Sequence, residues 1–398
     1  MSRIISLLSG KGGSGKTTLA LSFATMLSDC KIRTLLVDCD LSTNGATYFF
    51  EDQMSDDGYL TTFIDITLQR QELPYKPHIV NEFFDFLPAQ KNLRQVDALS
   101  TYGRHGNIEL LSSYFEKIKR NYDVILLDCQ AGYTDLLDFI IPFSNFNLVI
   151  MEADAISSAA IRNLYLKVAT LMGESKFYQV FNKVTPDEYD IYRKVTGGTF
   201  FTNVGTITFD WSIRKAFSLA QIPDLKNAHS EYGFQIYEIC KAVFIGARYQ
   251  ERLAIFNLNY SIEKIDAEMK DLKYELTNEK KTYTHDKFFR NLSTIVSVIG
   301  CCFGLFFTLL LANNQLEAIW GNLTSNATLI AMIAAISVPL ILSLIASLLS
   351  IWQDKKMFGS QWKIRHEREA NLYIKREALA TELERVKERT GIVQPNKP

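Results

Sequence analysis

Short apolar runs recur through the first 245 residues, separated by stretches in which apolar positions follow a helical period. The runs are rich in Ile, Leu, Val and Phe, as is typical of buried strands. They lie at residues 4–8, 34–37, 84–87, 124–127, 148–151, 178–181 and 204–208. Strands that alternate with helices predict an α/β fold, with a mostly parallel sheet and helices on both faces. We therefore assign residues 1–245 to one α/β domain.

The pattern changes after this domain. Between residues 246 and 290 apolar residues recur at alternating steps of three and four, which is the spacing of a coiled-coil seam, and the charged tail at 353–398 offers a weaker complement. The seam residues are Ile255, Leu258, Ile262, Ile265, Met269, Leu272 and Leu276, with Leu372, Leu379, Leu383 and Val386 in the tail. We expect the two helices to form an antiparallel stalk, either within one chain or across a dimer. Alternatively, each covers the preceding domain as an amphipathic helix.

Two apolar blocks without charge, residues 291–312 and 327–352, lie between these helical segments. At about 1.5 Å per helical residue, each is long enough for the roughly 30 Å core of a bilayer. They predict two transmembrane helices joined by a short external loop at 313–326. Lys and Arg flank the outer ends of both blocks and are absent from the loop. This distribution predicts that both termini are cytoplasmic, with the lipid bilayer of a bacterial inner membrane as a partner. The alternative is a pair of buried core helices.

Composition narrows the function classes. The 398 residues contain 43 Lys and Arg against 44 Asp and Glu, so the net charge is −1 and no specific nucleic-acid partner is expected. The 47% hydrophobic content argues against disorder. The six cysteines form no CxxC pair. A disulfide framework, a structural zinc site and an iron–sulfur site are therefore not expected, and a reducing compartment fits.

The strongest motif lies directly after the first predicted strand. Residues 10–18 have the sequence GKGGSGKTT, which satisfies G-x-x-x-x-G-K-[ST] in the required strand–loop–helix context. In such a loop, backbone N–H groups and a helix N-terminus surround a phosphate chain. Lys16 is expected to reach the β- and γ-phosphates, and the Thr17 hydroxyl to hold Mg²⁺. The expected nucleotide-binding residues here are Gly12, Gly13, Ser14, Gly15, Lys16, Thr17 and Thr18.

Two carboxylates lie where the second predicted strand ends. Asp38 and Asp40 straddle the change from strand to loop, so both can approach the phosphate-binding loop. One of them can hold the hydration shell of the magnesium ion while the other aligns a water molecule with the γ-phosphorus. The alternatives are a helix or turn cap for Asp38 and a solvated loop acid for Asp40.

Lys11 gives the loop a second lysine, in the form K-G-G-x-G-K-T-T. With this deviant Walker A motif the chain resembles the ParA/MinD family of ATPases. Further matches follow in family order over residues 1–245: VDCD at 37–40, YDVILLDCQAG at 122–132, FNK at 181–183 and TFD at 208–210. The chain departs from the family pattern at Leu41, Ser42 and Thr43, which replace P-Q-G, and at Gln130, which replaces a proline.

The resemblance implies ATP and Mg²⁺ as cofactors, slow ATP hydrolysis and a homodimer that forms on ATP binding. It places Lys11 on the phosphates of the partner subunit and Asp40 beside the attacking water. It also places Asp128 in the Mg²⁺ shell, with Asp38 and Thr17. Lys11, Lys16 and Asp40 are therefore the expected catalytic residues, and Thr17, Asp38 and Asp128 the expected metal site.

Two later matches concern recognition of the nucleotide base. Asn182 and Asp210 occupy positions of the family's nucleotide-binding elements. Guanine recognition in comparable GTPases uses an Asp two residues after the Lys, and this chain has Thr185 there. ATP is therefore favoured over GTP, although Asn182 alone also fits a turn at a strand end.

The combined features predict a membrane-anchored ATPase that acts as an ATP-dependent dimerisation switch. It would signal to an unidentified protein partner through the stalk and the transmembrane hairpin. An alternative is an ATP-binding transmembrane scaffold with little hydrolysis, because the switch residues at 41–43 and 130 are altered. A bacterial tyrosine kinase is a weaker alternative, because its hairpin would precede the ATPase domain and a tyrosine-rich tail would follow it.

Overall fold

The computed structural model describes residues 2–54, 60–68, 75–90, 108–171, 176–185, 187–188, 190, 200–227, 230–244, 247–312 and 326–390. They form two compact units. The first contains the chain up to Lys264 together with the stretch from Leu379, and the second runs from Ile265 to Ala378.

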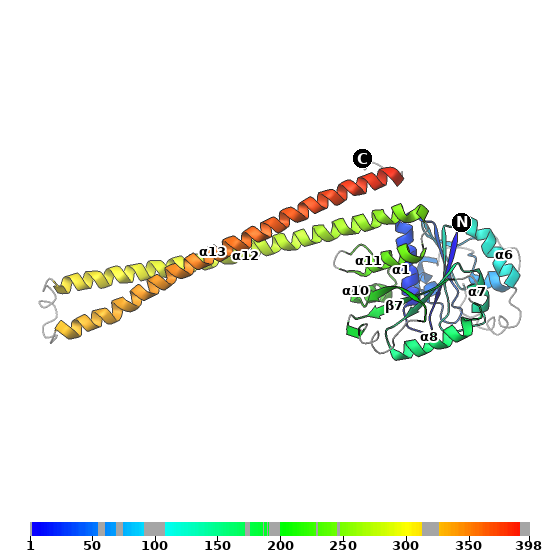
Figure 1. The fold of residues 1–398 in the computed structure, drawn as a ribbon, viewed down its shortest axis with the longest axis horizontal. Coiled ribbons are helices and arrows are strands. Elements are labelled where there is room, and N and C mark those ends of the chain that lie inside the picture. Colours follow the sequence, from blue (N-terminus) through cyan, green and yellow to red (C-terminus); the bar gives the residue numbers. More distant parts are fainter. Residues whose placement is uncertain are drawn as a thin grey trace. The chain divides into compact units, whose positions relative to one another are not determined.

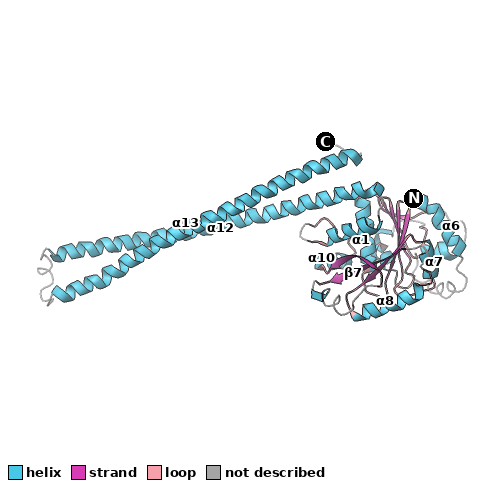
Figure 2. Cartoon of the chain, viewed as in Figure 1, coloured by secondary structure: helices cyan, strands magenta, loops and turns pink. Residues whose placement is uncertain are grey.

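An eight-stranded sheet forms the centre of the first unit (Figure 2). The strands are β1 (Arg3–Leu8), β2 (Thr34–Asp38), β3 (His78–Asn81), β4 (Phe84–Leu87), β5 (Val124–Asp128), β6 (Phe146–Met151), β7 (Lys176–Val184) and β8 (Thr202–Thr208). Their order is β3-β4-β2-β5-β1-β6-β7-β8, and every neighbouring pair is parallel except β3 with β4. All seven predicted strands are present. The sequence pattern missed β3, a four-residue edge strand whose Ile79 is exposed.

Helices cover both faces of the sheet, because alternate strand residues point to opposite sides (Figure 1). Ile5 and Leu7 of β1 join one apolar core, and Ile4 and Leu8 join the other. The first core includes residues of α1 (Lys16–Asp29), α2 (Gly45–Phe49), α10 (Trp211–Ser218), α11 (Tyr232–Ile239) and the start of α12 (Ala247–Ala312). The second includes residues of α4 (Phe63–Leu68), α6 (Ile108–Ile118), α7 (Leu137–Phe143) and α8 (Ala155–Val168). The predicted α/β class is confirmed.

Smaller elements complete this unit. They are the helix α3 (Glu51–Met54), a 3₁₀ turn at Lys119–Asn121 and a π-helical turn at Cys240–Phe244.

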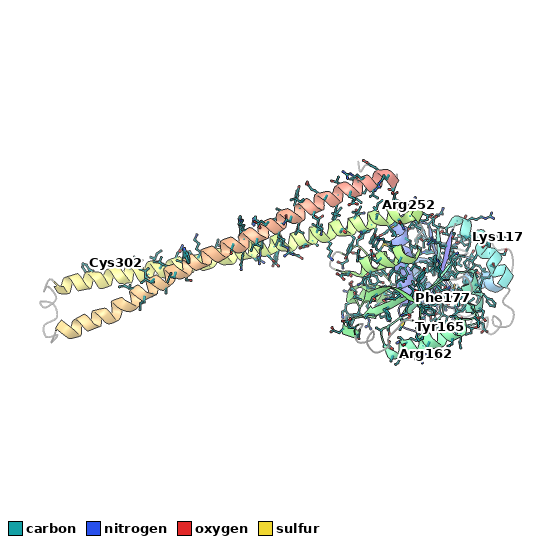
Figure 3. The ribbon with its side chains drawn as sticks, in the orientation of Figure 1. Lys117, Arg162, Tyr165, Phe177, Arg252 and Cys302 are labelled. Carbon is teal, nitrogen blue, oxygen red and sulfur yellow. The ribbon has the colours of Figure 1, made fainter. Side chains whose placement is uncertain are left out.

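On the second face, Tyr165 of α8 contacts the ring of Phe201, which stacks on Phe177 of β7 at 5.3 Å (Figure 3). These aromatic contacts fix α8 against the sheet, and the residue before α8 is part of the site described below.

Two long helices follow, α12 with 66 residues and α13 (Asn326–Thr390) with 65. In the first unit Leu258 packs with Leu383 and Val386. In the second unit Arg376 donates to both carboxylate oxygens of Asp266, at 2.5 and 3.2 Å. Within each unit α12 and α13 therefore pair in antiparallel order within one chain, and the amphipathic seam faces the other helix as predicted.

The two predicted transmembrane helices, at 291–312 and 327–352, are not supported. Over the residues that the structure describes, no helix combines the length and apolar character that a membrane span needs. Both ranges lie inside α12 and α13, so they are not separate elements. Of positions 301–340, only Cys302 and Phe306 have described side chains. The predicted loop at 313–326 lies outside the described residues, except for Asn326.

The predictions that depended on those spans lose their support with them. They are the lipid-bilayer partner, the inner-membrane localisation and the topology with both termini cytoplasmic. The predicted segment boundaries at 246, 291, 313, 327 and 353 remain predictions.

Candidate functional site

A cavity of about 770 Å³ opens at the carboxyl ends of the parallel strands, where ligands bind in open α/β sheets. The phosphate-binding loop, the loop after β2 and the ends of β7 and β8 form its walls. The lining residues are Gly12, Gly13, Gly15, Lys16, Thr17, Thr18, Asp40, Ser42, Thr43, Gly45, Gln130, Ala131, Asn182, Lys183, Thr208, Phe209, Asp210, Ile213, Arg214, Phe217, Ser218 and Tyr232. Most of the predicted site residues are thus gathered in one place, although their sequence positions span almost 200 residues.

The loop between β1 and α1 depends on glycine at two positions. Gly13 and Gly15 have φ angles of 79° and 90°, which L-residues rarely adopt. A Cβ at Gly15 would also lie 2.4 Å from Nδ2 of Asn182. That amide donates to the carbonyl oxygen of Ser14 at 2.8 Å. Asn182 thus ties the end of β7 to the loop, a contact that its predicted role in base binding did not include.

Asp38 and Asp128 lie side by side at the ends of β2 and β5. Both are buried, with exposed fractions of 0% and 1%. The carboxylate of Asp38 accepts hydrogen bonds from the N–H and hydroxyl of Thr47, at 2.8 and 2.7 Å, and from the N–H of Asp40 at 3.0 Å. Burial and the charge of Asp128 nevertheless raise the pKa of Asp38. Asp38 therefore anchors α2 and the loop before it to the sheet.

Asp128 differs from Asp38 in its bonding. Among the described residues, neither of its carboxylate oxygens makes a hydrogen bond of full geometry, and the groups that interact with it are the Lys16 ammonium and the Thr17 hydroxyl. Burial raises the pKa of Asp128, while Lys16 and Thr17 act in the opposite direction. A buried carboxylate with so few partners is costly, and a cation bound beside it would reduce that cost. Together with the Thr17 hydroxyl, this oxygen-rich donor set suits Mg²⁺.

Asp40 lines the cavity, but its carboxylate is already engaged. Ser42 donates to it through its N–H and its hydroxyl, at 3.1 and 2.7 Å, and Thr43 does the same at 3.0 and 2.6 Å. Burial alone would raise the pKa of Asp40, but these bonds outweigh burial and lower it. Ser42 and Thr43, two of the residues that depart from the family pattern, therefore hold Asp40 charged and turned towards its own loop.

Lys11 does not line the cavity. Its Nζ lies 3.0 Å from Glu152 and 3.2 Å from Asp154 of the same subunit. Asp154 also caps α8 by accepting from the N–H of Ser157 at 2.7 Å. Lys183 reaches the other oxygen of Glu152 at 3.1 Å and donates to the carbonyl oxygen of Gly13. Four charged side chains thus form one cluster beside the loop.

Aromatic residues form the far end of the cavity. Phe217 of α10 stacks on Phe49 of α2 with ring centres 5.7 Å apart. Tyr232 lines the cavity, and its hydroxyl lies 2.9 Å from the hydroxyl of Ser22 in α1. Asp210 caps α10 by accepting from the N–H and hydroxyl of Ser212, at 2.7 and 2.6 Å. A flat heterocycle with polar edges fits these surroundings.

Sequence reasoning missed several residues of this site, among them Glu152, Asp154, Phe217 and Tyr232. The two acids could have been found, because both follow a predicted strand and such strand ends meet at one edge of the sheet. Tyr232 gave no local signal, because it comes to the cavity only through the packing of α11 on α1.

Comparison with known proteins supports the likeness in sequence. The family model described as an AAA domain matches residues 2–178. The septum site-determining protein MinD of Synechocystis sp. is 30% identical over 139 residues, which are 33% of this chain and 46% of MinD. The antiactivator FleN of Pseudomonas aeruginosa is 26% identical over 226 residues, covering 54% of this chain and 76% of FleN. The N-terminal domain is therefore similar in sequence to P-loop ATPases of the ParA/MinD family.

Solved structures share the fold of this N-terminal domain. A putative plasmid partition protein from Borrelia burgdorferi B31 bound to AMPPNP superposes with a TM-score of 0.52 at 17% identity, over 61% of this chain and 98% of the other. MinD from Pyrococcus horikoshii complexed with Mg-ADP gives 0.50 at 20% identity, over 61% and 96%. The chain spans about half of the length of the curated relatives that it matches first.

Proposed function

We propose that the cavity binds ATP with Mg²⁺ and that the chain acts as an ATP-dependent dimerising switch. The observation that carries this proposal is the buried carboxylate of Asp128, which makes no hydrogen bond of full geometry among the described residues and lies beside Lys16 and Thr17 beneath a glycine-rich loop. A buried negative charge in that position favours a bound cation. A phosphate chain on the loop would contact the same cation.

Each predicted residue then has a specific task. Backbone N–H groups of residues 12–18 and the Lys16 ammonium would bind the phosphate chain, and Thr17 and Asp128 would hold Mg²⁺. Asp38 would contribute indirectly, because Thr47 and the N–H of Asp40 already occupy its oxygens. The magnesium ion would neutralise part of the negative charge of the phosphate chain. Asn182 and Asp210 would lie at the base.

Dimerisation is the effect that we assign to nucleotide binding. Lys11 would leave Glu152 and Asp154 and contact the phosphates bound by a second copy of the chain. The γ-phosphate then adds contacts that exist only in the dimer, and hydrolysis removes them. A solved MinC:MinD complex from Aquifex aeolicus shows one such domain bound to a protein partner. By analogy, we propose an unidentified protein partner for this chain, with α12 and α13 as the connecting element.

A second candidate is an ATP-binding scaffold with little hydrolysis. The four hydrogen bonds from Ser42 and Thr43 to Asp40 favour it, because a carboxylate so engaged is poorly placed to orient water. The double variant Ser42→Ala, Thr43→Val separates the two candidates. If the hydroxyl groups restrain Asp40, phosphate release by the variant exceeds that of the wild type.

The primary test uses the full chain with a fluorescent ATP analogue and Mg²⁺. Wild type is expected to bind the analogue, to sediment as a dimer with ATP and to release phosphate slowly. Lys16→Ala is expected to lose binding, whereas Lys11→Ala is expected to bind but remain monomeric. Lys119→Ala removes a surface lysine paired with Glu116 and serves as the control. A Lys16→Ala protein with wild-type affinity would exclude this cavity as the nucleotide site.

A further inference from the structure

A chain of hydrogen bonds leads from the cavity to α12. It begins at Asp210, whose Oδ1 caps α10 while its Oδ2 accepts a hydrogen bond from the hydroxyl of Ser230. Asp210 lines the cavity directly. A ligand that approaches this carboxylate therefore meets a group whose two oxygens are each committed to a different part of the fold.

Ser230 is the second link. Its hydroxyl also accepts from the N–H of Tyr232, at 3.1 Å, and its carbonyl oxygen accepts from the hydroxyl of Tyr260 at 2.8 Å. Tyr260 belongs to α12 and is 4% exposed. Its ring stacks on Phe234 of α11 with centres 6.1 Å apart. Because a buried phenol must keep a hydrogen-bond partner, a shift of Ser230 requires a shift of Tyr260 or a lost bond.

The same part of α12 is integral to the ATPase domain. Leu253 and Phe256 are buried in its core, and Arg252 donates to the carbonyl oxygen of Lys31 at 2.7 Å (Figure 3). One turn earlier, Tyr249 donates to Asp123. We call residues 247–264 the helix root. Leu258 on the helix root contacts the end of α13, so the root also receives the second long helix.

We propose that Ser230 and Tyr260 are positioning residues of the nucleotide cavity, through which its occupancy is linked to the seating of the helix root. The inference rests on the proposed function. A base that forms a hydrogen bond with Asp210 either competes with Ser230 for the carboxylate or holds that carboxylate in place. Either event affects the hydrogen bond between Ser230 and Tyr260. Linkage is reciprocal, so a change at Tyr260 must also alter nucleotide affinity.

The chain provides a matched control. Tyr260 and Tyr249 lie on the same helix, and each donates its hydroxyl to an acceptor of the ATPase domain. Only the bond of Tyr260 leads to a residue that lines the cavity. Tyr260→Phe and Tyr249→Phe each remove one hydroxyl and retain the ring. Ser230→Ala removes the bond to Asp210 and keeps the carbonyl acceptor of Tyr260.

The experiment is hydrogen–deuterium exchange of the full chain with and without AMPPNP and Mg²⁺, with affinity measured in parallel. In the wild type, the nucleotide is expected to slow exchange in residues 249–264. Tyr260→Phe and Ser230→Ala are expected to lose this difference and to change AMPPNP affinity by about fivefold or more, a typical coupling. Tyr249→Phe is expected to keep the nucleotide-dependent difference and wild-type affinity.

The outcomes are distinguishable. If wild type binds AMPPNP but exchange in residues 249–264 does not change, this inference fails and the proposed function stands. If Tyr260→Phe and Tyr249→Phe behave alike, the bond of Tyr260 is merely structural and the inference also fails. If wild type binds no nucleotide, both the inference and the proposed function fail.

Discussion

The ammonium group of Lys11 lies 3.0 Å from a carboxylate oxygen of Glu152 in its own subunit. Its second partner, Asp154, lies 3.2 Å away. A lysine that is to reach the phosphates of a second copy must first leave both carboxylates. Because Lys11 and Glu152 are each about 30% exposed, the ion pair is screened by solvent and can be broken at modest cost.

We therefore expect Glu152→Gln to favour the dimer. A partly exposed ion pair contributes roughly 0.2–1 kcal/mol, so the nucleotide concentration at half-maximal dimerisation falls by about 1.4-fold to fivefold. Sedimentation over an ATP titration measures this value. Glu116→Gln, which removes the surface pair with Lys119, is the control and is expected to leave it unchanged. A Glu152→Gln protein that needs more nucleotide than wild type would contradict the idea that Glu152 restrains Lys11.

Asp40→Ala is expected to bind ATP and dimerise but stall. A residue that orients or activates water contributes about 10²- to 10⁴-fold, so phosphate release falls at least a hundredfold while affinity changes less than about threefold. Stopped-flow phosphate release and equilibrium binding separate the two quantities. Asp29→Ala, which removes a surface pair with Lys226, provides the control. Unchanged phosphate release in Asp40→Ala would mean that another residue orients the attacking water.

Mg²⁺-dependent nucleotide affinity is expected to rise with pH. Burial raises the pKa of Asp128 to about 6 and that of Asp38 to about 7, and the metal requires the deprotonated carboxylate. Affinity at pH 5 is therefore about tenfold below that at pH 7.5, since each pH unit below the pKa costs roughly tenfold. Calorimetry in buffers of different ionisation enthalpy detects the released proton. In Asp128→Asn this dependence is expected to weaken.

The same raised pKa values make the stability of the unliganded protein fall as the pH rises, whereas its nucleotide affinity is expected to rise. Because both pKa values are raised on folding, the folded chain binds more protons than the unfolded chain between about pH 4 and 7. The contribution of these two groups to stability is therefore full below pH 4 and falls as the pH rises through 6 and 7. Denaturant unfolding of wild type and Asp128→Asn over this range isolates the contribution of Asp128. A pH trend that is the same in both proteins would contradict it.

ATP is expected to compete at least tenfold better than GTP for the cavity. Thr185 stands where a guanine-binding acid would lie, and its N–H and hydroxyl bond to Glu188 at 3.0 and 2.8 Å. A polar group left without its partner costs roughly 1–3 kcal/mol, which corresponds to about a tenfold to hundredfold preference. Competition against a labelled ATP analogue measures the ratio. Equal displacement by both nucleotides would contradict the assignment of the base site.

The sequence by itself determined the parallel α/β domain and the phosphate-binding loop. Both depend on local patterns: strand runs alternate with helical periods, and the glycines at 13 and 15 adopt the backbone angles that such a loop needs. The helical seam around Leu258 was local in the same sense. The two apolar blocks were also a local pattern, and the transmembrane helices inferred from them are not supported by the part of the chain that the structure describes.

Which side chains meet depends on the packing of the whole domain. Lys11 pairs with acids more than 140 residues away, Asp210 reaches Tyr260 through Ser230, and the seam of α12 meets α13 within one chain. The tertiary structure also showed that Asp38 accepts hydrogen bonds from its neighbours, whereas among the described residues Asp128 makes none of full geometry. No periodicity encodes such contacts, because they depend on how helices and strands pack over a shared core. The physical reason is that a motif fixes the backbone over a few residues, while bonding and burial are set by everything packed against it.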